Sequence, residues 1–487
     1  MRVTGWQRVV VSFACAVAAS PFAGGGVPRA AQDPGVTQQA TQLARDERAI
    51  GTERTLAASV NEPRMVDTVK RLVAFGPRQY GTPSNHEAAA WLSSAFRDAG
   101  LEVSVREDPP RNWYQPVSWE IRTTADSPGA TGVVLKTAWP SSGAPSGSGS
   151  GALSLETSPG AVCLTSAGPT PESTSGCAAV LVDGRAAASG WPVVNRLRGT
   201  WTVPVFAVSP NETAPLREKL AAGGKVQVAF ALDAKSGNSG AQTVVATLPG
   251  RDRSKYILFC AHGDSDSGGP GANDNASGVA IVLEVARTLA EAVKSGAIPQ
   301  PAWDLRFASW GGEISSTREY LAAMDKDAAR LQAVVNYDQS GFGSSKDALY
   351  VEPDDVPANR EIVTLVRSVM TDHIGTPGFP EHAASIRSQG GTDSYVFQPR
   401  AQGATVYPSV TLYTSAWDRE RAVPVTEGFP PIKWYAGEQP GMVTVDGDAF
   451  YHSAGDTPAN TTDTEPSNMG WCARVGLLSA LRMMVGK

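Results

Sequence analysis

The sequence is poor in charge and has no long basic run. Lys, Arg, Asp and Glu make up 18% of the 487 residues, whereas soluble domains usually have about 25%. This rules out a coiled coil, whose heptads are rich in Glu and Lys. The net charge is −6, and without a basic patch we expect no nucleic-acid partner. The 41% of apolar residues is enough for a buried core, so the chain is not disordered throughout.

Several catalytic signatures are also missing. The chain has no G-x-S-x-G motif, which argues against a serine hydrolase of the α/β type. It has no H-E-x-x-H motif, which argues against a thermolysin-like zinc protease. No cysteine spacing is typical of a zinc site. The chain has five histidines, and two of them lie in polar, glycine-rich surroundings.

Long apolar runs are missing as well, apart from one near the N-terminus. Residues 9–19 are apolar and follow Arg2 and Arg8. This run is too short to span a bilayer and is typical of a signal peptide. Cys15 lies in it, but the residues before Cys15 fit a lipoprotein signal poorly. We therefore expect a signal peptide over 1–31, no membrane anchor after its removal, and a secreted or periplasmic protein.

Without Cys15, four cysteines remain, which permit three pairings. Cys163 and Cys177 flank a loop rich in Ser, Thr, Pro and Gly, so a local disulfide between them is expected in an oxidising compartment. Cys260 ends an apolar run and is interpreted as a small buried hydrophobic residue. Cys472 has no obvious partner.

The pattern along the chain changes four times. Residues 32–60 are polar and read as a linker or loose helix. Residues 61–115 show helical patterns and a strand, and residues 116–240 alternate short β-like runs with Gly, Ser and Pro turns. Residues 241–487 alternate strands and helices, which predicts an α/β sheet. The β-rich stretch is therefore interpreted as a module inserted between two parts of one domain.

Local signals set the boundaries of one early helix. Ser84 and Glu87 have the spacing of a capping box, which predicts that a helix begins there. Gly100 is placed to end it. The alternating residues 101–105 then predict a strand.

Polar side chains follow three of the predicted strands in the α/β region. Ligands in open α/β sheets bind at the carboxyl ends of strands. One further carboxylate precedes a helix, and one imidazole lies in a late loop. The six residues are His262, Asp264, Asp274, Glu313, Asp338 and His452.

Imidazole with several carboxylates suits zinc or a similar divalent ion. Carboxylates can bridge two ions about 3.5–4 Å apart, and a nearby carboxylate can act as a general base. Each residue also has a simpler explanation: Asp274 could cap a helix, Asp264 could form a turn, and His452 could simply pack. It is their convergence that favours a metal site.

The motifs resemble those of the co-catalytic zinc exopeptidases, the peptidase family twenty-eight that includes bacterial leucyl aminopeptidases, glutamate carboxypeptidase and the transferrin receptor ectodomain. The stretch AHGDSDSGGPGANDNASGVA is the most specific, and RFASWGGE, VVNYDQSGFG, GGTDSYVF and YHSAGDT follow in the family's order. The early FGPRQYGTPSNHEAAAWL is also similar. The resemblance implies a three-layer α/β sandwich with a mostly parallel mixed sheet and helices on both faces. It also implies that residues 116–240 are a protease-associated-like insert.

The resemblance also implies a role for each site residue. His262 and Asp338 would hold one zinc, Asp274 would bridge two ions, and His452 would bind the second. Asp264 would orient the ligand histidine. Glu313 would be the general base, and Thr392 and Asp393 would form a pair near the pocket.

The sequence departs from the family at one position. The family usually has two adjacent glutamates, a base followed by a zinc ligand, whereas here Glu313 is followed by Ile314. Either Glu313 is the base and the second zinc lacks a ligand, or Glu313 is the ligand and the base is gone. The preceding WGG favours the first reading, and Glu319 could serve as a substitute ligand.

We therefore expect a secreted exopeptidase with one or two zinc ions, an aminopeptidase acting on peptide or protein substrates. Two alternatives remain. One is a catalytically impaired or inactive relative that binds a partner on the same scaffold. The other is a single-zinc enzyme of different chemistry, such as a glutaminyl cyclase.

Overall fold

The computed structural model describes residues 49–485 except for 125–131, 266–267, 324–329, 344, 374, 389–390, 399–404, 417–418 and 425–441. The expected signal peptide, with Cys15, lies outside the described residues. Of the expected linker, residues 52–58 are helical. No helix in the described part of the chain combines the length and apolar character that a membrane span requires.

The described residues of the α/β region form an eight-stranded mixed sheet in the order β1-β9-β11-β10-β12-β15-β13-β14. This confirms the predicted α/β class. The strands are β1 (Glu102–Glu107), β9 (Gln242–Leu248), β10 (Asp252–His262), β11 (Trp303–Trp310), β12 (Leu331–Tyr337), β13 (Ala348–Glu352), β14 (His382–Ser385) and β15 (Ser409–Tyr413). A separate ribbon pairs β16 (Arg421–Pro424) with β17 (Met442–Val445).

The central strands are parallel, and this brings their carboxyl ends to one edge. β10 pairs in parallel with both β11 and β12, with His262 opposite Trp310. β11 and β12 are almost entirely buried, and so is β10 from Tyr256 to His262, which explains their continuous apolar sequences. The loops that follow them therefore start side by side.

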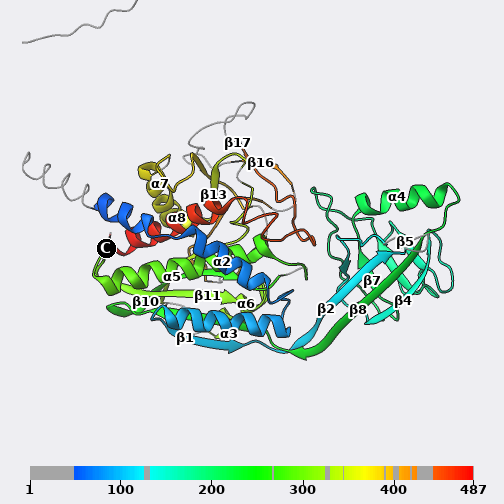
Figure 1. Cartoon of the computed structure of the whole chain (residues 1–487). Coiled ribbons are helices and arrows are strands. Elements are labelled where there is room, and N and C mark those ends of the chain that lie inside the picture. Colours follow the sequence, from blue (N-terminus) through cyan, green and yellow to red (C-terminus); the bar gives the residue numbers. More distant parts are fainter. Residues whose placement is uncertain are drawn as a thin grey trace, which may run out of the picture. The chain divides into compact units, whose positions relative to one another are not determined.

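Helices cover the sheet and bury its larger apolar face. Figure 1 shows α5 lying along β10 and β11, and α5 packs on both of these strands, while α2 packs on α5. The helices are α2 (Glu62–Val73), α3 (Pro83–Asp98), α5 (Gly278–Ser295), α6 (Ser315–Ala323), α7 (Arg360–His373) and α8 (Pro466–Val485), with single turns η1 (Ala272–Ser277), η3 (Pro357–Asn359) and η4 (Asp393–Phe397). Residues of α2, α3, α5, α7 and α8 share one core cluster with the strands, while Tyr320 and Phe397 pack on the opposite face.

The predicted capping box of α3 is wrong, although its end is correct. Thr82 is the N-cap, and its side chain accepts a hydrogen bond from the Asn85 amide. Ser84 lies inside the helix, and its hydroxyl donates to the Phe75 carbonyl oxygen. Pro83 explains the shift, because proline is favoured in the first turn of a helix. Gly100 has a φ of 86° and lies just beyond the helix, as predicted.

A second sheet is built from strands between residues 111 and 239. Its described strands have the order β2-β8-β4-β5-β6-β7-β3. They are β2 (Arg111–Thr123), β3 (Trp139–Pro140), β4 (Gly147–Ser154), β5 (Val162–Thr165), β6 (Ala179–Val182), β7 (Val205–Ala207) and β8 (Gln227–Ser239), with helix α4 (Pro210–Ala221). Figure 1 shows β2 and β8 side by side as a long ribbon, in agreement with their antiparallel pairing. This β-rich module has its own apolar core.

The predicted local disulfide is present. Cys163 and Cys177 are bonded across a sequence separation of 14 residues, while Cys260 and Cys472 are buried free thiols. Closing a loop of this length contributes about 3 kcal/mol to stability. We therefore expect the C163S/C177S variant to unfold at a lower temperature in a thermal scan, and reductant to have the same effect on the wild type. Equal melting temperatures would contradict this estimate.

Candidate metal centre and catalytic site

Three of the predicted site residues converge at the carboxyl edge of the sheet. His262 is the last residue of β10, Asp338 directly follows β12, and Asp274 lies in η1 before α5. One ligand atom from each lies within 4.8 Å of the others, and all three residues are buried. The His262 Nε2 is 3.3 Å from an Asp274 carboxylate oxygen and 3.5 Å from an Asp338 carboxylate oxygen. This is a compact group of one imidazole and two carboxylates.

The cluster fits a divalent cation. The Nε2 of His262 and the Oδ1 of Asp338 are buried and make no hydrogen bond of good geometry among the described residues, although they lie 3.5 Å apart, which is rare for polar atoms in an interior. Burial alone would lower the pKa of His262, but the carboxylates of Asp264, Asp274 and Asp338 raise it well above its usual value. The carboxylates therefore create a strong local demand for positive charge. Zinc suits this set of nitrogen and oxygen donors.

Asp264 holds both the imidazole and the loop of the expected base. Its Oδ1 is 3.0 Å from the Nδ1 of His262, and the same oxygen accepts a hydrogen bond of 3.0 Å from the Glu313 amide. A hydrogen on Nδ1 directed to this carboxylate leaves the Nε2 lone pair free to bind a metal. Asp264 is thus a positioning residue in this geometry.

We expect the Asp264→Ala variant to bind zinc about 10–100-fold more weakly, because partners of ligand histidines typically contribute this much. Competition with a fluorescent chelator measures the effect. Asp304→Ala is the matched control, because Asp304 is also buried but bonds to the Gly250 amide. Unchanged zinc affinity in Asp264→Ala would show that the carboxylate does not orient His262.

Asp274 faces two imidazoles with different oxygens. Its Oδ1 faces His262, and its Oδ2 is 3.1 Å from the Nε2 of His452. The pKa of Asp274 lies far below its usual range, because hydrogen bonds and charge from both histidines outweigh the effect of burial. This is the arrangement of a carboxylate able to bridge two cations. His452 has a φ of 52° and a side chain that is 29% exposed.

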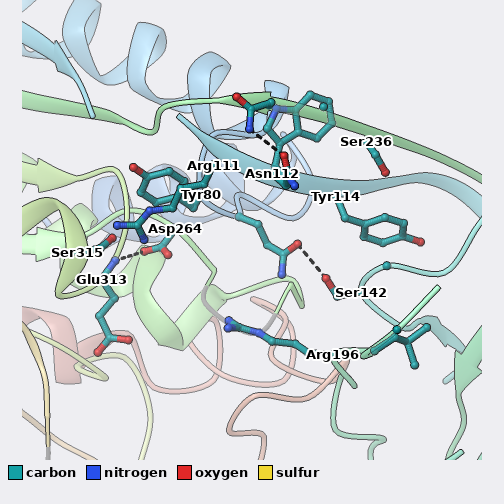
Figure 2. Close-up of a pocket in the computed structure, with 17 residues that line it drawn as sticks. Tyr80, Arg111, Asn112, Tyr114, Ser142, Arg196, Ser236, Asp264, Glu313 and Ser315 are labelled. Carbon is teal, nitrogen blue, oxygen red and sulfur yellow. Dashed lines mark hydrogen bonds between the residues drawn. The ribbon is translucent and has the colours of Figure 1, made fainter. Parts of the chain in front are cut away.

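Glu313 lies beside the cluster at a cavity of about 1080 Å³. Figure 2 shows its carboxylate extending away from Asp264, with Arg111, Arg196 and Tyr80 also lining the cavity. Burial raises the pKa of Glu313 well above its ordinary value, and the charges of Asp338, Asp393 and Asp274 raise it further against the effect of His262. A carboxyl with a raised pKa suits proton transfer near neutral pH.

Ile314 lies in a strained turn directly after Glu313. Its φ is 56°, which is unfavourable for a β-branched residue, and its amide donates to Asp393 at 2.8 Å. Glu319 does not reach the metal cluster: its carboxylate lies 3.6 Å from Arg106. The described residues therefore offer Asp274 and His452, without a neighbouring glutamate, for a second ion.

Thr392 and Asp393 hold neighbouring parts of the site by hydrogen bonds. The Thr392 hydroxyl donates to the Asp338 Oδ2 at 2.6 Å, so it fixes that carboxylate. Asp393 accepts hydrogen bonds from the Ile314 amide and the Thr317 hydroxyl. The pair thus braces one cluster residue and the turn that carries Glu313.

Sequence reasoning missed two supporting residues. Arg78 is completely buried, and its guanidinium donates to the carbonyl oxygens of Gly263, Pro270 and Gly271 at 2.7–3.0 Å. The Asp456 carboxylate accepts hydrogen bonds from the backbone amides of Asn273 and Asp274 at 2.7 and 3.0 Å. Both lie inside quoted motifs, but a buried arginine or aspartate has no sequence pattern that reveals its partners.

A protein-family model described as "Peptidase family M28" matches residues 243–475. The chain is 25% identical over 335 residues to the probable lipoprotein aminopeptidase LpqL of Mycobacterium tuberculosis, covering 64% of this chain and 62% of that protein. It is 26% identical over 267 residues to leucine aminopeptidase 2 of Trichophyton rubrum, covering 53% and 48%. The chain therefore spans about half to three fifths of the length of these relatives.

Two solved structures share the fold. A zinc aminopeptidase from Bacillus subtilis superimposes with a TM-score of 0.52 at 18% identity, covering 87% of this chain and 95% of that one. A peptidase M28 precursor from Shewanella amazonensis gives a TM-score of 0.57 at 15% identity, covering 90% and 97%. The fold is that of these peptidases, and the cluster has donor groups that fit a divalent metal ion. The family model that matches residues 243–475 is that of the exopeptidase family that the motifs resemble.

Proposed function

We propose that the chain is a zinc-dependent exopeptidase that removes N-terminal residues from peptides and acts outside the cytoplasm. The observation that carries this proposal is the buried cluster of His262, Asp274 and Asp338 beside Glu313 at the cavity. Two relatives with similar sequences are named as aminopeptidases, which supports it. The apolar N-terminal run supports export.

His262, Asp274 and Asp338 would hold the principal zinc. Three protein ligands with an open position are the usual set of a catalytic zinc. When bound there, zinc polarises the scissile carbonyl and lowers the pKa of a water molecule. Asp264 keeps the imidazole of His262 in the tautomer that the ligand role needs.

Glu313 would move the proton. Its carboxylate accepts a proton from the attacking water and then donates it to the leaving amine, so that the peptide bond is replaced by a free acid and a free amine. Burial raises the pKa of Glu313, which makes the protonated form available for the second transfer. The cavity of about 1080 Å³ offers room for a peptide end beside it.

A second zinc would bind more weakly than the first. Asp274 is shared, His452 is the other ligand, and Ile314 stands where the resembled family has a glutamate. Fewer protein ligands mean lower affinity, so the second position depends on how firmly His452 is held. We therefore propose one tightly bound ion and one that exchanges.

Hydrolysis of leucine p-nitroanilide by the signal-free protein tests the proposal. We expect turnover that a chelator abolishes and zinc restores, and no turnover of the N-acetylated substrate, because an aminopeptidase requires a free amine. Hydrolysis of the acetylated substrate would indicate a different peptidase specificity. No turnover across a broad peptide panel by zinc-loaded protein would refute the proposal.

Ile314 favours one second candidate, a relative that binds peptides without cleaving them. The cavity and the first metal cluster would persist in such a protein, but Glu313→Gln would change no measurable activity. Peptide binding without hydrolysis distinguishes it. Release of ammonia from peptides with N-terminal glutamine would indicate the cyclase alternative instead.

A further inference from the structure

The loop that carries His452 has no regular secondary structure among its described residues, although Asp448 and Asp456 in it bond to η1. Between β17 and α8, the described residues 446–465 form turns and one isolated bridge but no helix or strand. His452 itself adopts a left-handed φ of 52°, which costs a non-glycine residue free energy. A ligand on such a loop stays in place only if neighbouring structure holds it.

The neighbouring structure comes from the β-rich module. Residues 185–194, here called the insert hairpin, run beside this loop. The Val194 amide donates to the His452 carbonyl oxygen, and the Ala454 amide donates to the Pro192 carbonyl oxygen, both at 3.0 Å. Val193 and Ser453 form an antiparallel bridge between these two bonds. The backbone on both sides of His452 is thus paired with the insert hairpin.

A side-chain contact also joins the insert hairpin to the His452 loop. A Cβ added at Gly455 would lie 2.4 Å from the Trp191 Cγ and 2.8 Å from a ring carbon of Phe450. The indole of Trp191 therefore rests directly on the glycine backbone three residues beyond the ligand. The Ser189 amide also donates to the Ala449 carbonyl oxygen at 3.0 Å.

The insert hairpin is itself braced within its own module. The Ala187 amide donates to the Trp191 carbonyl oxygen at 2.9 Å, and the Val193 amide donates to the Arg185 carbonyl oxygen at 3.1 Å. The Ser209 hydroxyl, at the N-cap of α4, donates to the Gly190 carbonyl oxygen at 2.7 Å. The hairpin can therefore transmit the rigidity of the module to the His452 loop.

We propose that the insert hairpin is a positioning element of the metal centre, which holds His452 so that its imidazole can bind the second ion. The inference rests on the proposed zinc site but not on peptidase activity. With Asp274 and His452 as the described ligands of that position, its affinity depends directly on the hairpin. The chain continues from the hairpin to Arg196 and Leu197, which line the cavity beside Glu313 (Figure 2).

Zinc titration of the metal-free, signal-free protein by calorimetry tests this role. We expect Trp191→Ala and Val194→Pro to weaken the second site by about 10-fold or more, as positioning partners do, and His452→Ala to abolish it. The first site, at His262, should keep its affinity and so reports that the peptidase region is folded. Trp201→Ala is the matched control, because Trp201 packs in the core of the same module.

Hydrogen exchange supplies an independent measurement. Amides of residues 449–455 should exchange faster in Trp191→Ala than in the wild type or in Trp201→Ala, with the metal absent in all three. The proposal is overturned if Trp191→Ala and Val194→Pro bind both ions like the wild type. It is equally overturned if His452→Ala leaves zinc binding unchanged, since His452 would then be no ligand.

These readouts separate this inference from the proposed function. Both the titration and the exchange experiment are independent of substrate turnover. If the variants lose the second site in a protein that cleaves no peptide, the positioning role stands and the peptidase proposal fails. If the protein cleaves peptides and the variants bind zinc normally, the peptidase proposal stands and the positioning role of the insert hairpin fails.

Discussion

Replacing Glu313 with glutamine is expected to lower kcat for aminoacyl amide hydrolysis by about 10²–10⁴-fold, the usual contribution of a general acid–base group. The amide cannot accept a proton from water, yet it keeps the shape of the side chain. The backbone of residue 313 would still bond to Asp264, so the metal cluster should remain intact. Zinc content measured beside the kinetics should therefore equal that of the wild type.

Glu319→Gln is the matched control for this experiment. Glu319 lies in the same segment, but its carboxylate faces Arg106. We expect its activity to stay close to that of the wild type. If Glu313→Gln were fully active, Glu313 would not be the base. A loss of bound zinc in this variant would instead support the reading in which Glu313 is a metal ligand.

Replacing His262 with alanine is expected to remove the principal zinc and all measurable hydrolysis. The wild type should gain thermal stability from zinc, about 4 kcal/mol when the free ion is 1,000 times its dissociation constant. His262→Ala should lose most of this gain, because its remaining carboxylates offer no nitrogen ligand. Differential scanning calorimetry with and without zinc measures the difference.

His86→Ala serves as the control for this second prediction. His86 is another of the five histidines, and its Nε2 lies 2.8 Å from the Gly240 carbonyl oxygen, away from the cluster. Its zinc response should match that of the wild type. An unchanged zinc response in His262→Ala would mean that the cluster is not where the ion binds.

The sheet and its polar edge could be predicted because their signals are local. The apolar runs of β10, β11 and β12 are continuous, and parallel strands place the residues that follow them at one edge. His262, Asp338 and Glu313 were predicted as site residues in this way, and the structure places His262 and Asp338 in one cluster. The disulfide between Cys163 and Cys177 was also local, since both flank one short loop.

The supporting contacts could not be predicted because they join distant segments. Arg78 reaches carbonyl groups nearly two hundred residues away, and the insert hairpin pairs with backbone at His452. Backbone pairing of this kind leaves no mark on side-chain composition. The capping error at Ser84 had a nearer cause: proline at position 83 moved the start of the helix to Thr82.

The most direct test of the metal cluster is the number of zinc ions retained per chain, measured by elemental mass spectrometry on the signal-free protein. After zinc loading and extensive dialysis, we expect one ion per chain in the wild type and in Glu313→Gln, and none in His262→Ala. A second ion should appear only when free zinc is kept in the buffer. A wild-type protein that retains no zinc after loading would contradict the account and indicate a binding protein built on a peptidase fold.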